Sequence, residues 1–479
     1  MVMSHEASPV ATRTPRGVAA TVAALGIASF VVMVDSTVVQ VMLPNLMGEW
    51  DAGLAGVLWV ANAFTLVYGV LLLPGARLGD MVGRRAMLVT GLVLFLLGSV
   101  LCGSAWSLPV LVAGRVVQAV GGALLIPQTL GMLATVVPEH RRGLAFGLVS
   151  ASMALAAITG PVLGGIVVSS AGWRWVFLAN VPGCALALAA VAWAPTTWEA
   201  KQAHELDVIG VLLVIAGLGA VVYGFIAGGR QGFGGVVPAV FAAGAVLIAA
   251  FLLWERRRAE PLVPLGLFRV RGFPVALGLG VLQFVLMSGV MLIVTLKVQT
   301  ALGGNAFQTG VVLLPMALAA GVVSPFAGHA TDRWGGRPVI MLGFLVLGGG
   351  LAGLAVVSSA VGTAALLAPL AAVGAGVGLL MGPISTEVVA HLPRELVNTG
   401  SGVLTTSRQI AGALGVAVVG ALLQSATSGS GFVPAERSAL AVLGVLAAVA
   451  VVGAAFLPAR RRAVGAPDPG ARSGAPDAG

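Results

Sequence analysis

The sequence contains few charged residues. Only 9% of its 479 residues are Asp, Glu, Lys or Arg, whereas a soluble domain carries about a quarter. Water therefore cannot solvate most of the surface of this chain, which excludes an ordinary soluble enzyme or a soluble binding module. The sequence also lacks H-E-x-x-H, G-x-S-x-G and paired C-x-x-C motifs, so an enzyme that works inside the membrane is disfavoured.

Cysteine is scarce, and alternating strand patterns are missing. The two cysteines, Cys102 and Cys184, fall in apolar runs and support neither a disulfide framework nor a metal site. The apolar runs are continuous, without the period-2 alternation of membrane β-barrel strands. Hydrophobic residues make up 58% of the chain and the mean hydropathy is +1.03. Because only helices or closed barrels satisfy the backbone in hydrocarbon, the composition predicts an all-α polytopic membrane protein, for which we expect no cofactor.

The apolar runs are long enough for about fourteen membrane spans, at about 20 residues per helix. The run after the basic segment 1–16 is too long for a signal-peptide core and contains Asp35, so we interpret it as a retained first span. The Pro-, Gly- and Ala-rich segment 459–479 is predicted to be a disordered tail. The predicted spans are 17–44, 54–76, 86–106, 109–136, 143–170, 175–195, 207–228, 234–254, 273–299, 307–330, 338–358, 362–390, 398–424 and 437–458.

Basic residues alternate between the predicted loops. The less basic loops hold little besides Arg174, Arg230 and Arg437. Under the positive-inside rule the basic loops and both termini are cytoplasmic, which requires an even number of spans. We therefore expect a multi-pass protein of the cell membrane, whose formal charge of +9 serves orientation and contact with lipid headgroups rather than nucleic acid. The basic loops contain Arg77, Arg84, Arg85, Arg141, Arg142, Lys201, Arg256, Arg257, Arg258, Arg269, Arg271, Arg333, Arg337 and Arg394.

A charged loop occurs twice, between the second and third predicted spans and between the tenth and eleventh. In each copy an acid is followed three residues later by glycine and then by arginine. Repeated halves around a central site are the usual plan of secondary transporters. We expect two six-helix bundles, 17–195 and 273–458, with two inserted helices in 196–272. The two copies are Asp80-Met81-Val82-Gly83-Arg84-Arg85 and Asp332-Arg333-Trp334-Gly335-Gly336-Arg337.

Several motifs in the expected order resemble the fourteen-helix drug:proton antiporter branch of the major facilitator superfamily, over about 31–420. The string Gly160-Pro161-Val162-Leu163-Gly164-Gly165 resembles the antiporter motif G-P-x-x-G-G. Its proline bends the helix and its glycines permit close helix contact; plain G-x-x-x-G packing explains the glycines but not the whole string. Residues 172–182, G-W-R-W-V-F-L-A-N-V-P, resemble the family's entry to span six. The resemblance implies the major facilitator fold and export, and we expect a monomer.

In this family the repeated loop is thought to latch one conformation and to break during switching. The resemblance implies this gating role for residues of both copies, although Ala76 and Met81 depart from the usual glycine and basic residue of the first copy. The alternative is a solvated turn that only obeys the positive-inside rule. The residues concerned are Asp80, Gly83, Arg84, Arg85, Gly328, Asp332, Arg333 and Arg337.

Two charged residues lie well inside apolar spans and match further family strings. Asp35 belongs to a D-x-T-x-V string in span one, and Arg115 and Gln118 belong to an L-x-x-x-R-x-x-Q-G string in span four. Burial favours the neutral form of a carboxyl, and a neighbouring guanidinium favours the charged form. Our hypothesis is that Asp35 carries the proton, with Arg115 as its electrostatic partner in the substrate cavity with Gln118. The alternative is that both residues only hold helices together.

Other polar positions in the apolar runs are more ambiguous. Arg408 and Gln409 match the branch's T-x-x-R-Q-x-G-G string, which assigns them to the substrate cavity, although an arginine that snorkels to the cytoplasmic surface is an alternative. Lys297 and Glu387 lie near predicted span ends and are interpreted as interfacial charges. The spelling G-x-G-x-x-G at 348–353 matches a dinucleotide fingerprint, but it has no preceding strand and is assigned to helix packing.

The leading functional hypothesis is proton-coupled export of small amphipathic compounds such as antibiotics or dyes. Few acids line the membrane region, so neutral or singly charged compounds fit better than multivalent cations. The alternative within the same fold is a proton symporter or a facilitator for a small metabolite. The direction in which a pH gradient drives transport separates the two.

Overall fold

The computed structural model describes residues 15–137, 139–193, 207–258, 260–357, 362–390, 392–393, 396–427 and 431–458. Throughout these ranges the secondary structure is helical, with no strand. The tail residues 1–14 and 459–479 lie outside the described residues, as do Lys201 and Arg394 of the basic loops. The all-α prediction is confirmed.

Seven helices, α1 to α7, form the N-terminal group, called the first group from here on. The predicted span 175–195 is interrupted at Ala179, between a short helix and a longer one. Prolines within the helices, such as Pro44 in the first and Pro161 in the fifth, remove backbone hydrogen bonds, but the helices continue past them. The helices are α1 (Pro15–Glu49), α2 (Leu54–Val82), α3 (Arg84–Gly103), α4 (Leu108–Val136), α5 (Glu139–Ala171), α6 (Arg174–Leu178) and α7 (Asn180–Trp193).

The inserted pair and the second group follow. The last predicted span begins earlier than expected, at Phe432 rather than 437, so Arg437 lies within a helix and not in a loop. The pair is α8 (Val208–Gln231) and α9 (Val237–Glu255), followed by the 3₁₀ turn η1 (Leu265–Arg269). The second group is α10 (Phe273–Leu296), the π-helical turn η2 (Lys297–Ala301), α11 (Ala306–Trp334), α12 (Gly336–Val356), η4 (Thr363–Leu366), α13 (Leu367–Val389), α14 (Val397–Thr427) and α15 (Phe432–Ala454).

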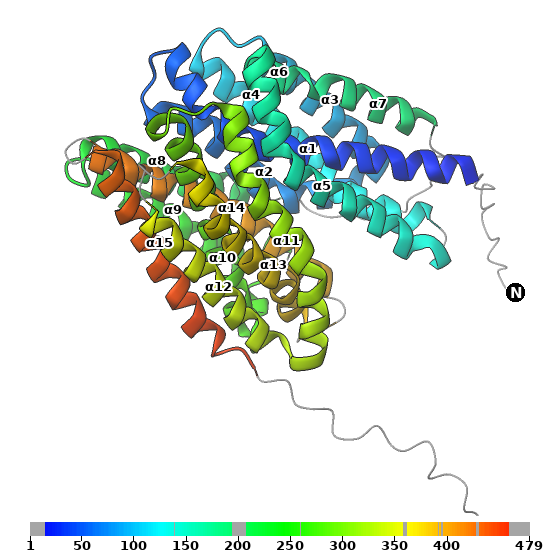
Figure 1. Cartoon of the computed structure of the whole chain (residues 1–479). Coiled ribbons are helices and arrows are strands. Elements are labelled where there is room, and N and C mark those ends of the chain that lie inside the picture. The colour runs from blue at the N-terminus through cyan, green and yellow to red at the C-terminus, as the bar shows by residue number, and fades with distance from the viewer. Residues whose placement is uncertain are drawn as a thin grey trace, which may run out of the picture.

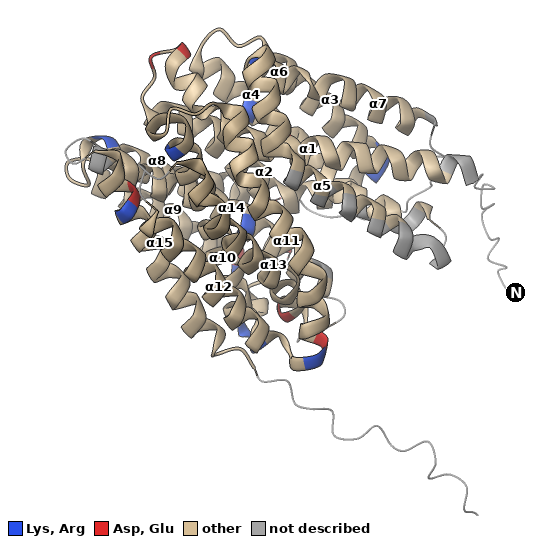
Figure 2. Cartoon of the chain, in the orientation of Figure 1, with Lys and Arg blue, Asp and Glu red and all other residues tan. Residues whose placement is uncertain are grey.

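The helices are suited to a bilayer. Among the described residues, thirteen helices are long and apolar enough to cross it, and Thr159–Ala171 of α5 is a shorter apolar helix. Large apolar side chains such as Leu186, Val322 and Phe326 are exposed, which suits lipid rather than water. Charged residues gather mostly at helix ends, with wide uncharged surfaces between them (Figure 2). The prediction of a multi-pass membrane protein is therefore confirmed.

The two groups meet along two seams and diverge elsewhere. One seam joins the end of α5 to the start of α11, and the other joins α2 to α14. A methyl group at Gly165 of α5 would overlap the backbone of Ala306 and Phe307 of α11, so these helices touch backbone to backbone. The start of α1 and the end of α15 lie far apart (Figure 1). Beyond the α5–α11 contact the groups therefore diverge, whereas the α2–α14 seam continues along most of both helices, from Leu58 beside Gly420 to Leu73 beside Gly402.

The inserted pair packs on the outside of the α2–α14 seam, where α8 contacts both helices. Asp207 caps α8 by accepting a hydrogen bond from the Gly210 N–H at 3.0 Å, and it also accepts one from the indole of Trp254 in α9 at 2.8 Å. The buried Glu255 accepts from the backbone N–H groups of Leu262 and Val263. These two carboxylates fix the pair and the segment after it.

Candidate functional site

The structure brings Asp35 of α1 and Arg115 of α4 together. Their side chains are 1% exposed or less, and Nη1 of Arg115 lies 2.5 Å from Oδ2 of Asp35. Removing one partner of such a buried pair leaves an uncompensated charge, which costs about 3–5 kcal/mol. A proton on Asp35, or a ligand charge beside Arg115, would therefore change the free energy of this pair by a large amount.

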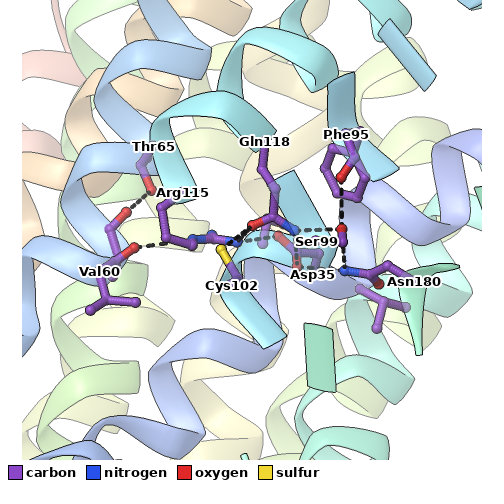
Figure 3. A network of polar contacts seen from close by, with 12 residues as sticks. Asp35, Val60, Thr65, Phe95, Ser99, Cys102, Arg115, Gln118 and Asn180 are labelled. Atoms are coloured by element: carbon purple, nitrogen blue, oxygen red, sulfur yellow. Dashed lines mark hydrogen bonds and ion pairs between the residues drawn. The ribbon is translucent and has the colours of Figure 1, made fainter. Parts of the chain in front are cut away.

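The second oxygen of Asp35 is also occupied. Its Oδ1 accepts hydrogen bonds from Nδ2 of Asn180 at 2.8 Å and from Nε2 of Gln118 at 3.3 Å. Gln118 also donates to Oγ of Ser99 at 2.7 Å and accepts from Nη1 of Arg115 at 2.8 Å. The network joins α1, α3, α4 and α7 (Figure 3). The sequence patterns predict Asp35, Arg115 and Gln118 for this site, but they indicate neither Ser99 nor the role of Asn180.

The guanidinium of Arg115 is fixed by α2. Its Nε donates to the carbonyl oxygen of Val60 at 3.1 Å, and its Cζ lies 4.1 Å from the centre of the Phe64 ring. The Phe177 ring is 5.6 Å away. A planar fork that bonds in two directions while its face lies on a ring is the geometry of arginine, whereas the lysine ammonium is a compact point charge without this fork.

The network lies toward the ends predicted to be extracellular. Arg115 is seven residues from the start of α4, and Asn180 is the first residue of α7. At 1.5 Å per residue, the backbone of Arg115 lies about 10 Å from the start of α4. Beyond it, Glu49 at the end of α1 accepts a hydrogen bond from the indole of Trp173 and pairs with Arg174 at 2.6 Å. The W-R-W string therefore holds the outer end of the first group together.

The glycines of the antiporter motif have different neighbours. Side chains at Gly160 and Gly164 would overlap Thr37 and Val38 of α1, two and three residues beyond Asp35. Gly165 faces α11 instead. Pro161 contacts α11 as well, because a methyl group at Gly310 would overlap its carbonyl oxygen. The motif thus connects the helix of Asp35 to the seam between the two groups.

Both copies of the charged loop adopt the same backbone turn. Gly83 and Gly335 have φ of 117° and 85°, in a region that residues with a side chain rarely adopt. In each copy the glycine N–H donates to a carbonyl four residues earlier at 2.9 Å, Gly79 or Thr331. The acid-x-x-Gly spacing therefore ends one helix and starts the next in a single residue.

The charges of the first copy connect helix ends. Asp80 and Arg84 form a partly exposed pair at 3.2 Å, and Arg84 also packs against Gly131 of α4. Arg85 donates to the carbonyl oxygen of Val191 in α7 at 3.0 Å. In the second copy Gly336 packs against the half-buried Glu387 of α13. Gly328 has open space around it, and Arg333 is exposed.

Arg408 and Gln409 of α14 face different neighbours. Arg408 donates to Oγ of Ser385 at 3.1 Å and to Oε1 of Gln283 at 3.4 Å, and its Cζ lies 5.4 Å from the Phe284 ring. Its guanidinium is directed toward α10 and α13. Gln409 packs at the α2–α14 seam against Gly69.

The interpretation of Lys297 as an interfacial charge is wrong. Its side chain is 1% exposed, and Nζ lies 2.7 Å from Oε1 of the buried Glu436 and 3.0 Å from the carbonyl oxygen of Val357. This ion pair ties the π-helical turn η2 to α15. Two residues on, Gln299 donates to the carbonyl oxygen of Val41 in α1 at 2.7 Å, which is a polar contact between the two groups.

Comparison with known proteins identifies the family. Residues 25–416 match the family model of the Major Facilitator Superfamily. The chain is 33% identical to "Multidrug resistance protein Stp" of Mycobacterium tuberculosis, over 84% of this chain and 75% of that protein. It is 31% identical to "Tetracenomycin C resistance and export protein" of Streptomyces glaucescens, over 85% and 76%.

A solved structure supports the fold. The crystal structure of a POT family transporter in complex with 5-aminolevulinic acid matches with a TM-score of 0.65, at 15% identity, over 91% of this chain and 96% of that chain. The helical membrane architecture and the family match agree with each other. The chain therefore belongs to the Major Facilitator Superfamily and is a membrane transporter, not an enzyme.

Proposed function

We propose that the chain is a proton-coupled antiporter that exports small amphipathic organic compounds from the cell. The observation that carries the proposal is the fully buried pair of Asp35 and Arg115, at 2.5 Å, inside a transporter fold. Ionisable residues buried in membrane helices are costly and typically serve ion or proton pathways. Asp35 is the group that can gain and lose a proton, because the guanidinium stays charged.

Coupling works through competition for this network. When Asp35 is ionised, it holds Arg115, Asn180 and Gln118. A proton on Asp35 removes the charge that Arg115 needs and loosens the network that joins α1, α3, α4 and α7. Substrate binding favours one state of the network and the proton favours the other, so the two ligands exchange as the groups rock.

The names of relatives support export, and the packing of the antiporter motif supports coupling between Asp35 and the seam. Several relatives are named as resistance or export proteins, and two of those names cite a compound, tetracenomycin C or lincomycin. The antiporter motif packs Gly160 and Gly164 against α1 and Gly165 against α11, so a movement of α1 near Asp35 reaches the seam between the groups directly.

The remaining roles follow from the same scheme. The substrate cavity includes Asp35, Arg115 and Gln118 on one side and Arg408 and Gln409 on the other. The repeated charged loops latch the helix ends and release during switching. The two bundles 17–195 and 273–458 are the moving units, and 196–272 is the insertion. We further propose a monomer in the cell membrane, with both termini cytoplasmic.

Transport in inverted membrane vesicles tests the proposal. With an acidic lumen, the wild type should let protons out when an amphipathic dye is added and should accumulate that dye. Asp35→Asn should do neither, although it inserts and folds. The control Glu387→Gln alters a half-buried carboxylate of the second group and should retain transport. Undiminished exchange by Asp35→Asn would remove Asp35 from the mechanism, and flux of dye with the protons would favour the symporter.

A further inference from the structure

A cavity of about 200 Å³ lies where the inserted pair packs against the α2–α14 seam. One wall is a single face of α14, because Val403, Thr406, Ser407 and Ile410 are spaced three and four residues apart. Leu73 of α2 and Phe251 of α9 lie on other walls. The cavity is distinct from the network of Asp35, none of whose residues lines it.

The segment that lines one side of the cavity is held by specific contacts. Residues 262–268 contribute to the lining, and Glu255 accepts hydrogen bonds from two backbone N–H groups at the start of this segment. Arg77 of α2 donates to the carbonyl oxygens of Glu260 and Pro261. Because α2, α9 and this segment are tied together, the cavity is a formed feature of the fold.

Thr406 lines this apolar cavity and carries a polar atom without a partner. The residue is 9% exposed, and its Oγ1 has no hydrogen-bond partner among the described residues and is covered by neighbouring atoms, so a rotation about χ1 is needed to turn the hydroxyl toward the cavity. Threonines in membrane helices usually bond the carbonyl four residues earlier; Thr405 does so with Ser401 at 2.9 Å and Thr331 with Ala327 at 2.8 Å. A buried hydroxyl without a partner is uncommon in native structures and marks a place where a ligand can bond.

We propose that this cavity binds the apolar body of a small amphipathic compound, with Thr406 bonding a single polar group of that compound. Ligand sites are typically apolar with a few placed polar groups. An apolar cavity of about 150 Å³ accepts benzene, so this one suits a substituted ring or a short alkyl chain. The inference rests on the proposed function: the site receives exported compounds from the lipid phase before they reach the Asp35 network.

The test uses a diazirine-bearing octanol, which has an apolar chain and one hydroxyl, on purified protein without a proton gradient. After illumination, mass spectrometry of peptides should place saturable adducts on α2, α9 and α14 at the cavity. Thr406→Val keeps the shape and loses the hydroxyl, so half-saturation should need about fivefold more probe, as expected for one hydrogen bond. Val403→Trp fills the cavity and should remove the saturable adducts.

A matched control is Leu212→Trp, which adds the same side chain at a position of α8 that is 61% exposed and should leave the saturable adducts unchanged. Adducts that spread over exposed helix faces without saturating, or that survive both cavity substitutions, overturn the inference. Asp35→Asn should still label. If Asp35→Asn loses proton–substrate exchange while the cavity never labels, the transport proposal stands and the cavity proposal fails. If the cavity labels while Asp35→Asn transports normally, the cavity proposal stands and the transport proposal fails.

Discussion

Gly165→Ala, which adds one methyl group, should change which side of the transporter is open. The glycine packs α5 against Ala306 and Phe307 of α11, and a Cβ there would overlap backbone atoms that cannot turn aside. Overpacking of this kind costs about 1–3 kcal/mol. The cost applies only while the seam is closed, so Gly165→Ala should shift the equilibrium away from this conformation by about 5- to 150-fold.

Spin-label distances can measure this shift. Ser104, after α3, and Ser438, in α15, are exposed near the ends predicted to be extracellular, one in each group. The native Cys102 and Cys184 are buried, so labels attach to cysteines introduced at the two serines. The wild-type protein should give mainly the shorter distance of the closed seam. Gly165→Ala should add a longer distance as a major population.

The matched control is Gly412→Ala, at the other seam. A Cβ at Gly412 meets Thr65 of α2 at 3.7 Å, an ordinary contact, so this variant should keep the wild-type distances. If Gly165→Ala also keeps them, the α5–α11 contact does not hold the outer side closed, and the packing argument is refuted.

Three further predictions concern other contacts. Lys297→Met should lower the free energy of unfolding by about 3–5 kcal/mol, because it leaves Glu436 buried without its partner. Adding Glu436→Leu should recover most of this loss, as measured by thermal unfolding. If the losses of the two substitutions simply add, the ion pair is contradicted. Gly335→Ala should cost about 1–3 kcal/mol, since its φ of 85° strains a side chain, whereas Asp80→Asn, at a partly exposed pair, should cost under about 1 kcal/mol. Arg115→Lys should slow proton-driven efflux about tenfold or more, through the loss of charge-assisted bonds; efflux at the wild-type rate would show that the fork geometry is dispensable.

The helices could be predicted from the sequence because lipid leaves few alternatives. Long apolar runs must be helical in hydrocarbon, and the acid-x-x-Gly spacing indicated both tight turns. The sequence predicts the start of the last helix too late, because the charges at Glu436 and Arg437 look like a loop. Hydropathy counts Glu436 as exposed, whereas a partner 139 residues away allows its burial.

The site could be predicted in part. Asp35 and Arg115 stand out as charges in apolar runs, and the structure places them together. Neutral partners give a weaker signal. Ser99 looks like any polar residue of a membrane helix, and Asn180 belongs to the string 172–182 without a role being indicated for it. Only the three-dimensional packing of α3 and α7 brings the two residues into the network of Asp35. The cavity beside α14 is likewise a product of packing between distant segments.

The most direct test of the coupling is to count protons when substrate binds. Purified protein in a weakly buffered solution receives an exported compound, and the pH change is recorded over a range of starting pH values. Competition at Asp35 predicts that the wild type releases protons on binding and that Asp35→Asn binds the compound without releasing any. Proton uptake by the wild type, or equal release by Asp35→Asn, would contradict the account.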